Sequence, residues 1–165
     1  EQPNDDYANT IARQFLFDTY MFFLYEELKN SKDETIAAIA VKSHKEITYH
    51  LRHTSEWMLR LGDGTQESHD RLQNGINELW MFTSEFFDMD EVDTFLFEEG
   101  IAPDLNKVKT AWEKRVTEVL TQATIDIPTT PFKQKGSKEG KHSEHLGFLL
   151  AEMQYVHRAY PGAKW

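Results

Sequence analysis

The chain has 165 residues, a formal net charge of −10 and no cysteine. This length is enough for one domain with a hydrophobic core, and the lack of cysteine excludes disulfides, zinc–thiolate sites and thiol catalysis. The negative charge argues against nucleic acid and anionic membranes as partners, because both need a cationic surface. We therefore expect a protein of a reducing compartment, the cytoplasm, without nucleic-acid or membrane partners.

The first predicted helix spans residues 7–29. Its apolar positions recur at spacings of four and three, so they share one face, which also carries Asp18. Apolar side chains cover most of the other faces too, which predicts a helix that is buried all round. We expect the remaining helices to be too few to cover it. The most apolar run, residues 15–25, is too short to span a bilayer.

The second predicted helix runs from a capping box at Ser31 and Glu34 to about Leu61, where Gly62-Asp63-Gly64 ends it. Alternating spacings of four and three predict a long packing seam on this helix. The seam residues are Ile36, Ala40, Ser43, Ile47, His50, Thr54, Trp57 and Leu61.

The rest of the chain also follows a helical pattern. A third helix is predicted from Thr65 or Ser68 to residue 87, a short helix over 90–99, a fourth helix over 104–124 and a fifth over 143–160, capped by Ser143. The fold class is therefore predicted to be all-α. Four large aromatic residues are candidates for a protein interface: Trp57, Trp80, Phe86 and Phe87.

Residues 125–142 form a long irregular connection that contains two prolines and four lysines: Lys133, Lys135, Lys138 and Lys141. Loops of this length inside a compact domain are usually functional or disordered. One interpretation is a cationic surface for an acidic partner or for the phosphates of a substrate. The other interpretation is an ordinary solvated loop.

Residues 42–53 nearly match the metal motif of ferritin-like di-iron proteins. That motif is Glu-x-x-His on one helix face, where residues three apart are neighbours. Here His50 is present, but Ile47 takes the place of the ligand glutamate, and Glu46 lies four residues before the histidine instead. The pattern indicates a metal site that has been lost.

Asp18 lies on the apolar face of the first helix, and a buried carboxylate must be paired, protonated or bound to metal. Counting outward from the turn between two antiparallel helices places Asp18 level with about residue 45. Asp18, Glu46 and His50 are therefore predicted to approach one another. They would form either half of a di-metal centre or a buried polar cluster closed by Arg13 or Lys45.

The last predicted helix offers a weaker metal-binding pattern. His142 and His145 lie three residues apart, but such a pair needs further ligands. Glu152 is followed three residues later by Tyr155, where the motif needs a histidine. Exposed histidines at a helix start are the alternative interpretation.

Five stretches, which together sample the whole chain, resemble the C subunits of the bacterial 1,2-phenylacetyl-CoA epoxidases, the smaller ferritin-like subunits of the phenylacetate-degradation oxygenase. The stretches are residues 1–15, KEITYHLRHTSEW (45–57), NELWMFTSEFFD (77–88), EEGIAPD (98–104) and KHSEHLGFLLAEMQYVHRAYPG (141–162). The resemblance implies that residues 1–165 form a single ferritin-like helical domain. It also implies that this domain is the C-terminal two-thirds of the family's full chain, without two N-terminal helices.

The resemblance also suggests an explanation for the incomplete Glu-x-x-His motif at residues 47–50. The family's catalytic A subunit has a Lys-Glu-Glu-x-Phe-His stretch that matches residues 45–50, and its ligand glutamate falls on Ile47. Asp18 and His50 match two other ligand positions. Asp18, Glu46, Ile47 and His50 are then a vestigial site, with no metal, cofactor or catalytic residue in this chain and the di-iron centre in the partner A subunit.

The implied function is a non-catalytic structural subunit of a multicomponent di-iron monooxygenase that epoxidises the aromatic ring of phenylacetyl-CoA in phenylacetate catabolism. The alternative is a ferritin-like di-metal carboxylate oxidase with its own active site. The expected partner is the catalytic A subunit. Self-association is also expected, because the first helix carries more apolar surface than the chain can cover.

Overall fold

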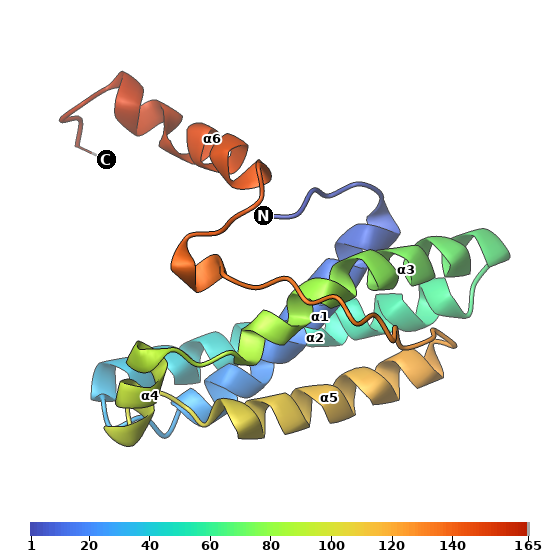
Figure 1. Ribbon diagram of the computed structural model, residues 1–165, viewed down its shortest axis with the longest axis horizontal. Helices are drawn as coiled ribbons and strands as arrows, with labels where there is room; N and C mark the ends of the chain where they lie inside the picture. The colour runs from blue at the N-terminus through green and yellow to red at the C-terminus, as the bar shows by residue number, and fades with distance from the viewer. Residues whose placement is uncertain (165) are drawn as a thin grey trace.

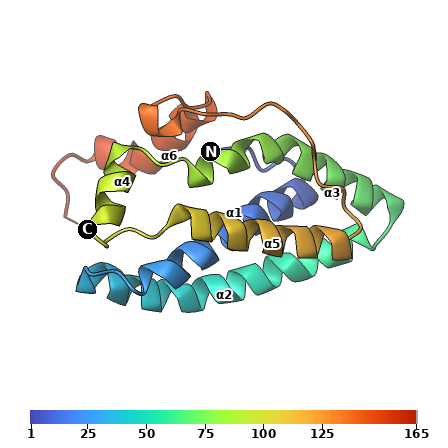
Figure 2. The same cartoon turned by 60° about the horizontal axis from the view of Figure 1, so that its bottom comes forward.

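The structure is a computed structural model, which describes residues 1–164. Four long helices build a bundle in which α1 lies against the other three (Figures 1 and 2). These helices are α1 (Tyr7–Leu28), α2 (Glu34–Gly62), α3 (Gln66–Leu79) and α5 (Leu105–Gln122). The short connection after α1 makes α1 and α2 an antiparallel hairpin.

Four shorter elements complete the described part of the chain. They are η1 (Trp80–Phe87), α4 (Glu91–Glu98), η2 (Ser137–Glu139) and α6 (His145–Ala159). All eight elements of residues 1–164 are helical. This arrangement confirms the predicted all-α class and fits a ferritin-like bundle. The helix α6 stands apart from the bundle, beyond the long connection that follows α5 (Figure 1).

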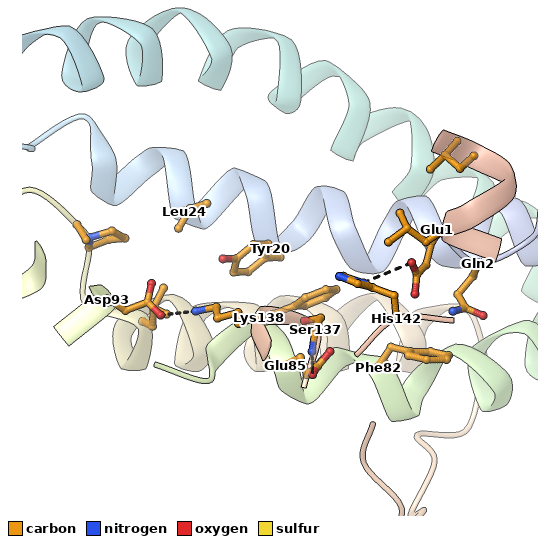
Figure 3. A pocket seen from close by; sticks show the side chains of 16 residues that line it. Glu1, Gln2, Tyr20, Leu24, Phe82, Glu85, Asp93, Ser137, Lys138 and His142 are labelled. Carbon is orange, nitrogen blue, oxygen red and sulfur yellow. Dashed lines mark hydrogen bonds and ion pairs between the residues drawn. The ribbon is translucent and has the colours of Figure 1, made fainter. Parts of the chain in front are cut away.

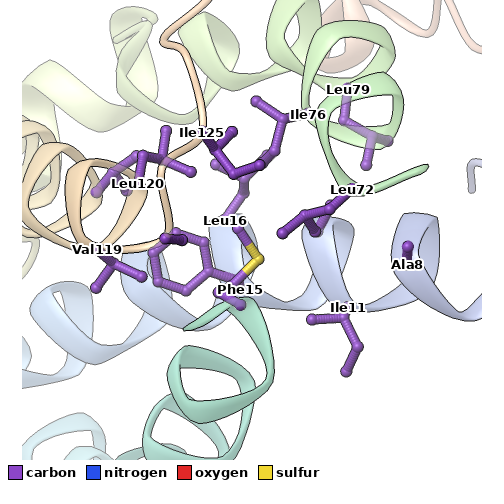
Figure 4. Close-up of a cluster of buried hydrophobic side chains, with 14 of the residues drawn as sticks. Ala8, Ile11, Phe15, Leu16, Leu72, Ile76, Leu79, Val119, Leu120 and Ile125 are labelled. Atoms are coloured by element: carbon purple, nitrogen blue, oxygen red, sulfur yellow. The ribbon is translucent and has the colours of Figure 1, made fainter. Parts of the chain in front are cut away.

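The core lies between α1 and its three neighbours (Figure 4). Phe15, Met58, Leu72, Ile76 and Leu120 are fully buried, and they come from four different helices. Burial of each such side chain is worth about 1.5–3 kcal/mol. The packing of these side chains therefore holds together helices whose isolated stability would be marginal.

The burial of α1 differs from the prediction. The segment Ala8–Thr19 supplies the buried residues of the helix, whereas Phe17 is 45% exposed and residues 20–25 are half-buried. The prediction of a helix buried all round is therefore wrong for its C-terminal half. The reason is geometric: α2, α3 and α5 pack against α1, whereas Tyr20 and Leu24, on its remaining side, line an open groove.

Two predicted helix caps are wrong. Asp33, and not Ser31, caps α2, since its carboxylate accepts hydrogen bonds from the backbone of Thr35 and Ile36. Ser31 instead donates from Oγ to the Ile101 carbonyl at 2.8 Å. Ser143 does not cap α6, because the N-cap residue is Glu144 and no side chain makes a capping hydrogen bond; the Ser143 N–H donates to Oε1 of Glu1 at 2.7 Å.

The other predicted helix starts hold. The Thr65 hydroxyl accepts from the N–H of Ser68 at 3.2 Å and caps α3. Asp90 and Asp93 form a reciprocal capping box at the start of α4. The third helix does not continue to residue 87, because Trp80–Phe87 winds as a 3₁₀ helix. In this segment Trp80 and Phe87 pack on Trp112, with ring centroids 5.8 and 5.5 Å apart from it.

Candidate functional site

The carboxylate of Asp18 is buried between α1 and α2, with 3% of the residue exposed. Thr54 Oγ1 lies 3.2 Å from Asp18 Oδ2. The same hydroxyl is 3.1 Å from the His50 carbonyl and 3.3 Å from the Leu51 carbonyl, so its single proton has three acceptors within reach. Burial raises the pKa of Asp18, and the Thr54 hydrogen bond with the nearby His50 and His53 lowers it only in part.

The structure does not bring the four predicted site residues together. Asp18 and Ile47 are buried, whereas Glu46 and His50 are exposed on α2. His50 lies near enough to lower the pKa of Asp18, but the side chain that hydrogen-bonds to Asp18 is Thr54, and not Glu46 or His50. Side chains lean toward the N-terminus of their helix. This lean displaces a contact by only about one residue on each helix, so Asp18 meets Thr54 chiefly because the two helices are offset in register from the count made outward from the turn.

Neither predicted cation closes this site. Arg13 donates to the Gln2 carbonyl at 2.6 Å and to Asn4 Oδ1 at 2.5 Å, which ties it to the N-terminal segment. Lys45 is exposed on α2. Thr54 is the hydrogen-bond partner of Asp18. The sequence pattern predicted Thr54 only as a packing residue of the seam. The sequence did offer one signal for this contact, because Thr54 places a hydroxyl group among the mostly apolar residues of the seam.

Ile47 is buried with 8% of its surface exposed, at the position where Glu-x-x-His carries its ligand glutamate. Within residues 1–164, the His, Asp and Glu side chains form no group of three or more that could hold a metal ion. His142 lies near Glu1, with Nδ1 and Oε2 3.5 Å apart. The chemistry available at this place is therefore that of a buried carboxylic acid with a hydroxyl donor.

Three of the four lysines of the connection form ion pairs within the chain. Lys135 Nζ lies 2.9 Å from Asp88 Oδ2, and Lys138 pairs with Asp93. Lys141 pairs with Glu139 at 2.9 Å. Three of the four predicted cationic side chains are thus neutralised inside the chain, which favours an ordinary solvated loop over an anion-binding surface.

A groove of about 690 Å³ lies between the bundle and the start of α6 (Figure 3). Its apolar wall includes Tyr20 and Leu24 of α1 and Phe82 and Phe86 of η1, and Leu146 and Leu149 of α6 also line it. A polar rim contains Glu1, Glu85, Asp93, Lys138 and His142. Sequence reasoning missed this groove, because nothing in the helical periodicity shows where the last helix lies.

The four aromatic residues predicted for an interface are half-buried and pack against other aromatic side chains of this chain. Phe86 stacks on Tyr20 at 4.9 Å, and Trp80, Phe86 and Phe87 surround Trp112. Trp57 is half-buried and packs edge-on against Tyr7 at 5.2 Å. The exposed aromatic side chains lie elsewhere. They include Tyr49, Phe95, Phe148, Tyr155 and Tyr160.

The fold and this site define a class: an all-α, ferritin-like helical bundle with a buried carboxylate, Asp18, between its first two helices. A family model described as "Phenylacetic acid catabolic protein" matches residues 1–165. The chain belongs to this family. It is 47% identical over 165 residues to the C subunit of 1,2-phenylacetyl-CoA epoxidase from Escherichia coli (strain K12), covering 100% of this chain and 66% of that relative.

The chain is shorter than its relative. The chain spans 66% of the length of the curated relative that it matches. Among the helices of residues 1–164, none combines the length and apolar character needed to cross a bilayer. The family membership confirms the resemblance drawn from the sequence.

Proposed function

We propose that this chain is a non-catalytic structural subunit of a phenylacetyl-CoA epoxidase complex in phenylacetate catabolism, and that its partner is the catalytic A subunit. In this role it supports ring epoxidation by shape and contact, while a di-iron centre in the partner performs the oxygen chemistry. The proposal rests on the chain's similarity to the C subunit of the Escherichia coli epoxidase. It also rests on the Glu-x-x-His motif, in which Ile47 takes the place of the ligand glutamate.

The observation that carries the non-catalytic role is the burial of Ile47. An apolar side chain cannot ligate a metal, and it fills the place of the bridging carboxylate. Glu46 and His50 are exposed, and Asp18 accepts a hydrogen bond from Thr54. Two surviving ligand positions are too few for two irons, which normally need carboxylates and histidines from all four helices of such a bundle.

The test is epoxidation of phenylacetyl-CoA by the catalytic A subunit, assembled with this chain or with its Asp18→Ala/His50→Ala double variant. Complex formation is measured in parallel by analytical ultracentrifugation. We expect turnover per assembled complex to be unchanged in the double variant. Normal assembly with lost turnover would mean that these residues act in the chemistry and would overturn the proposal.

Iron analysis separates this proposal from the alternative of a di-metal oxidase. The purified chain is incubated anaerobically with ferrous iron and desalted, and its metal content is then measured. A structural subunit retains far less than two irons per chain, whereas an oxidase retains about two. The A subunit, treated in the same way, is the positive control for the loading procedure.

A further inference from the structure

The short helix α4 is held at both ends by contacts with the rest of the chain. At its start, Asp90 and Asp93 form a reciprocal capping box, and Asp93 pairs with Lys138 of the long connection. Just past its end, the N–H of Lys32, in the turn between α1 and α2, donates to the Gly100 carbonyl at 3.0 Å. These contacts hold the helix in place at one end of the bundle (Figure 1).

The outer face of α4 combines apolar and acidic side chains. Val92 is 63% exposed and Phe95 59%, and residues three apart are neighbours on a helix surface. At 3.6 residues per turn, Glu91, Glu98 and Glu99 lie within about 60° of Phe95 around the helix axis. All five residues are exposed, and we call them the α4 face. An aromatic residue with charged neighbours is the arrangement of an interface anchor and its polar rim.

The three glutamates of the α4 face have no compensating positive charge. Within residues 1–164, none of them forms a salt bridge. Glu98 and Glu99 end the helix, and its last turn has no basic residue. Negative charge is unfavourable there, because the unpaired carbonyls at a helix C-terminus carry a partial negative charge. A sequence that breaks such a local rule without internal compensation is typical of a functional surface, and what this surface lacks is positive charge.

The charge of the α4 face selects among the possible occupants. A second copy of the chain also has a net charge of −10, which opposes its approach. Nucleic acid and anionic membranes are opposed for the same reason. A small cation would leave Val92 and Phe95 in contact with water. A protein surface with basic side chains around an apolar depression suits both parts of the face, because potentials across an interface are complementary.

We propose that the α4 face docks onto a surface of this kind on the catalytic A subunit. The identity of the partner rests on the proposed function, and the α4 face specifies where on this chain the contact is made. Phe95 enters the apolar depression, and basic side chains of the partner pair with Glu98 and Glu99. Because α4 is already folded and held to the bundle, docking does not have to order the helix, which lowers the cost of binding.

Charge reversal tests the acidic part of the face. The dissociation constant for the A subunit is measured by calorimetry with the parent chain and with a Glu98→Lys/Glu99→Lys variant. Lysine is favourable at a helix C-terminus, so the variant keeps α4 folded, which its amide NMR spectrum checks. We expect binding to weaken at least about tenfold. The matched control is Glu144→Lys/Glu152→Lys, which makes the same change in net charge at exposed positions of α6 and should weaken binding less than about twofold.

Phe95→Ser tests the apolar part of the face in the same assay. Phe95 is exposed, so the substitution leaves the core intact, and binding should weaken at least about tenfold. Phe148→Ser, at a 71% exposed position of α6, is the control. Parent-like binding by either α4 variant, or equal losses in the α6 controls, would overturn the proposal. Failure of the parent chain itself to bind the A subunit would overturn the proposed function, and this inference with it.

Discussion

Thr54 Oγ1 lies 3.2 Å from Asp18 Oδ2, and this contact joins α1 to α2 across the buried interior. No salt bridge to Asp18 is formed by the described residues. A buried carboxylate without a paired cation is desolvated without full compensation, so ionised Asp18 destabilises the folded chain.

Asp18→Asn should stabilise the protein at neutral pH. Burial raises the pKa of Asp18 above its unfolded value, so the folded state binds a proton more tightly than the unfolded state does. The unfolding free energy therefore falls as pH rises from the unfolded pKa of Asp18 to its folded pKa. Above the folded pKa, the full cost of burying the charged carboxylate is present. Asparagine keeps an oxygen acceptor for Thr54 and removes the charge.

The measurement is urea unfolding of Asp18→Asn and the parent chain between pH 3 and pH 8. The unfolding free energy of Asp18→Asn should exceed that of the parent chain at neutral pH. This difference should shrink as pH falls and vanish below the unfolded pKa of about 3.9. A difference in unfolding free energy that stays constant across this range would show that the charge of Asp18 is not the cause.

Thr54→Val should destabilise the protein at neutral pH by about 1.5–3 kcal/mol, because it removes a donor to a charged buried acceptor. Thr54→Ser keeps the hydroxyl and is the matched control. In the Asp18→Asn background the cost of Thr54→Val should be smaller, which a double-mutant cycle measures by chemical denaturation. Strictly additive free energies would mean that the two side chains do not interact.

The sequence predicted the helices well and this contact poorly, for a physical reason. Helix positions follow from local periodicity and from breakers such as Gly62 and Gly64, which act within a few residues. The partner of Asp18 depends on the register and side-chain lean of two helices, which no single segment encodes. The position of α6 was equally hidden, because it depends on contacts such as Ser143 with Glu1, 142 residues apart in the chain.

Gly62→Ala should destabilise the bundle by about 1–3 kcal/mol, because added volume at a close contact forces a shift. A Cβ at Gly62 would lie 2.1 Å from the Ala123 carbonyl oxygen, where α2 and the end of α5 meet. Gly147→Ala on α6 meets no atom within 4 Å and should stabilise this helix by about 0.5–1 kcal/mol. The unfolding free energies of Gly62→Ala and Gly147→Ala are measured by chemical denaturation. If the two substitutions changed this free energy equally, the close approach at Gly62 would be contradicted.

Lys138→Gln should lower stability by only about 0.2–1 kcal/mol, since its pair with Asp93 is partly exposed. The loss should be smaller at high salt, because ions screen the pair in the parent chain. Lys133→Gln is the control within the same loop. Thermal unfolding at low and high ionic strength gives the measurement, and a salt-independent loss would mean that packing of the lysine side chain matters more than its charge.

Ile47→Glu restores the glutamate of the Glu-x-x-His motif, and we expect it to destabilise the chain without creating an iron site. Ile47 is buried, so the new carboxylate would be desolvated at a cost of several kcal/mol. Ile47→Met, which keeps an apolar side chain, should cost less than about 1.5 kcal/mol. Because His50 and Glu46 are exposed, ferrous iron should not raise the melting temperature of Ile47→Glu under anaerobic conditions. A clear rise with iron, absent in Ile47→Met, would mean that the helix frame still holds metal-ligand geometry and that a single substitution separates this chain from a metal-binding bundle.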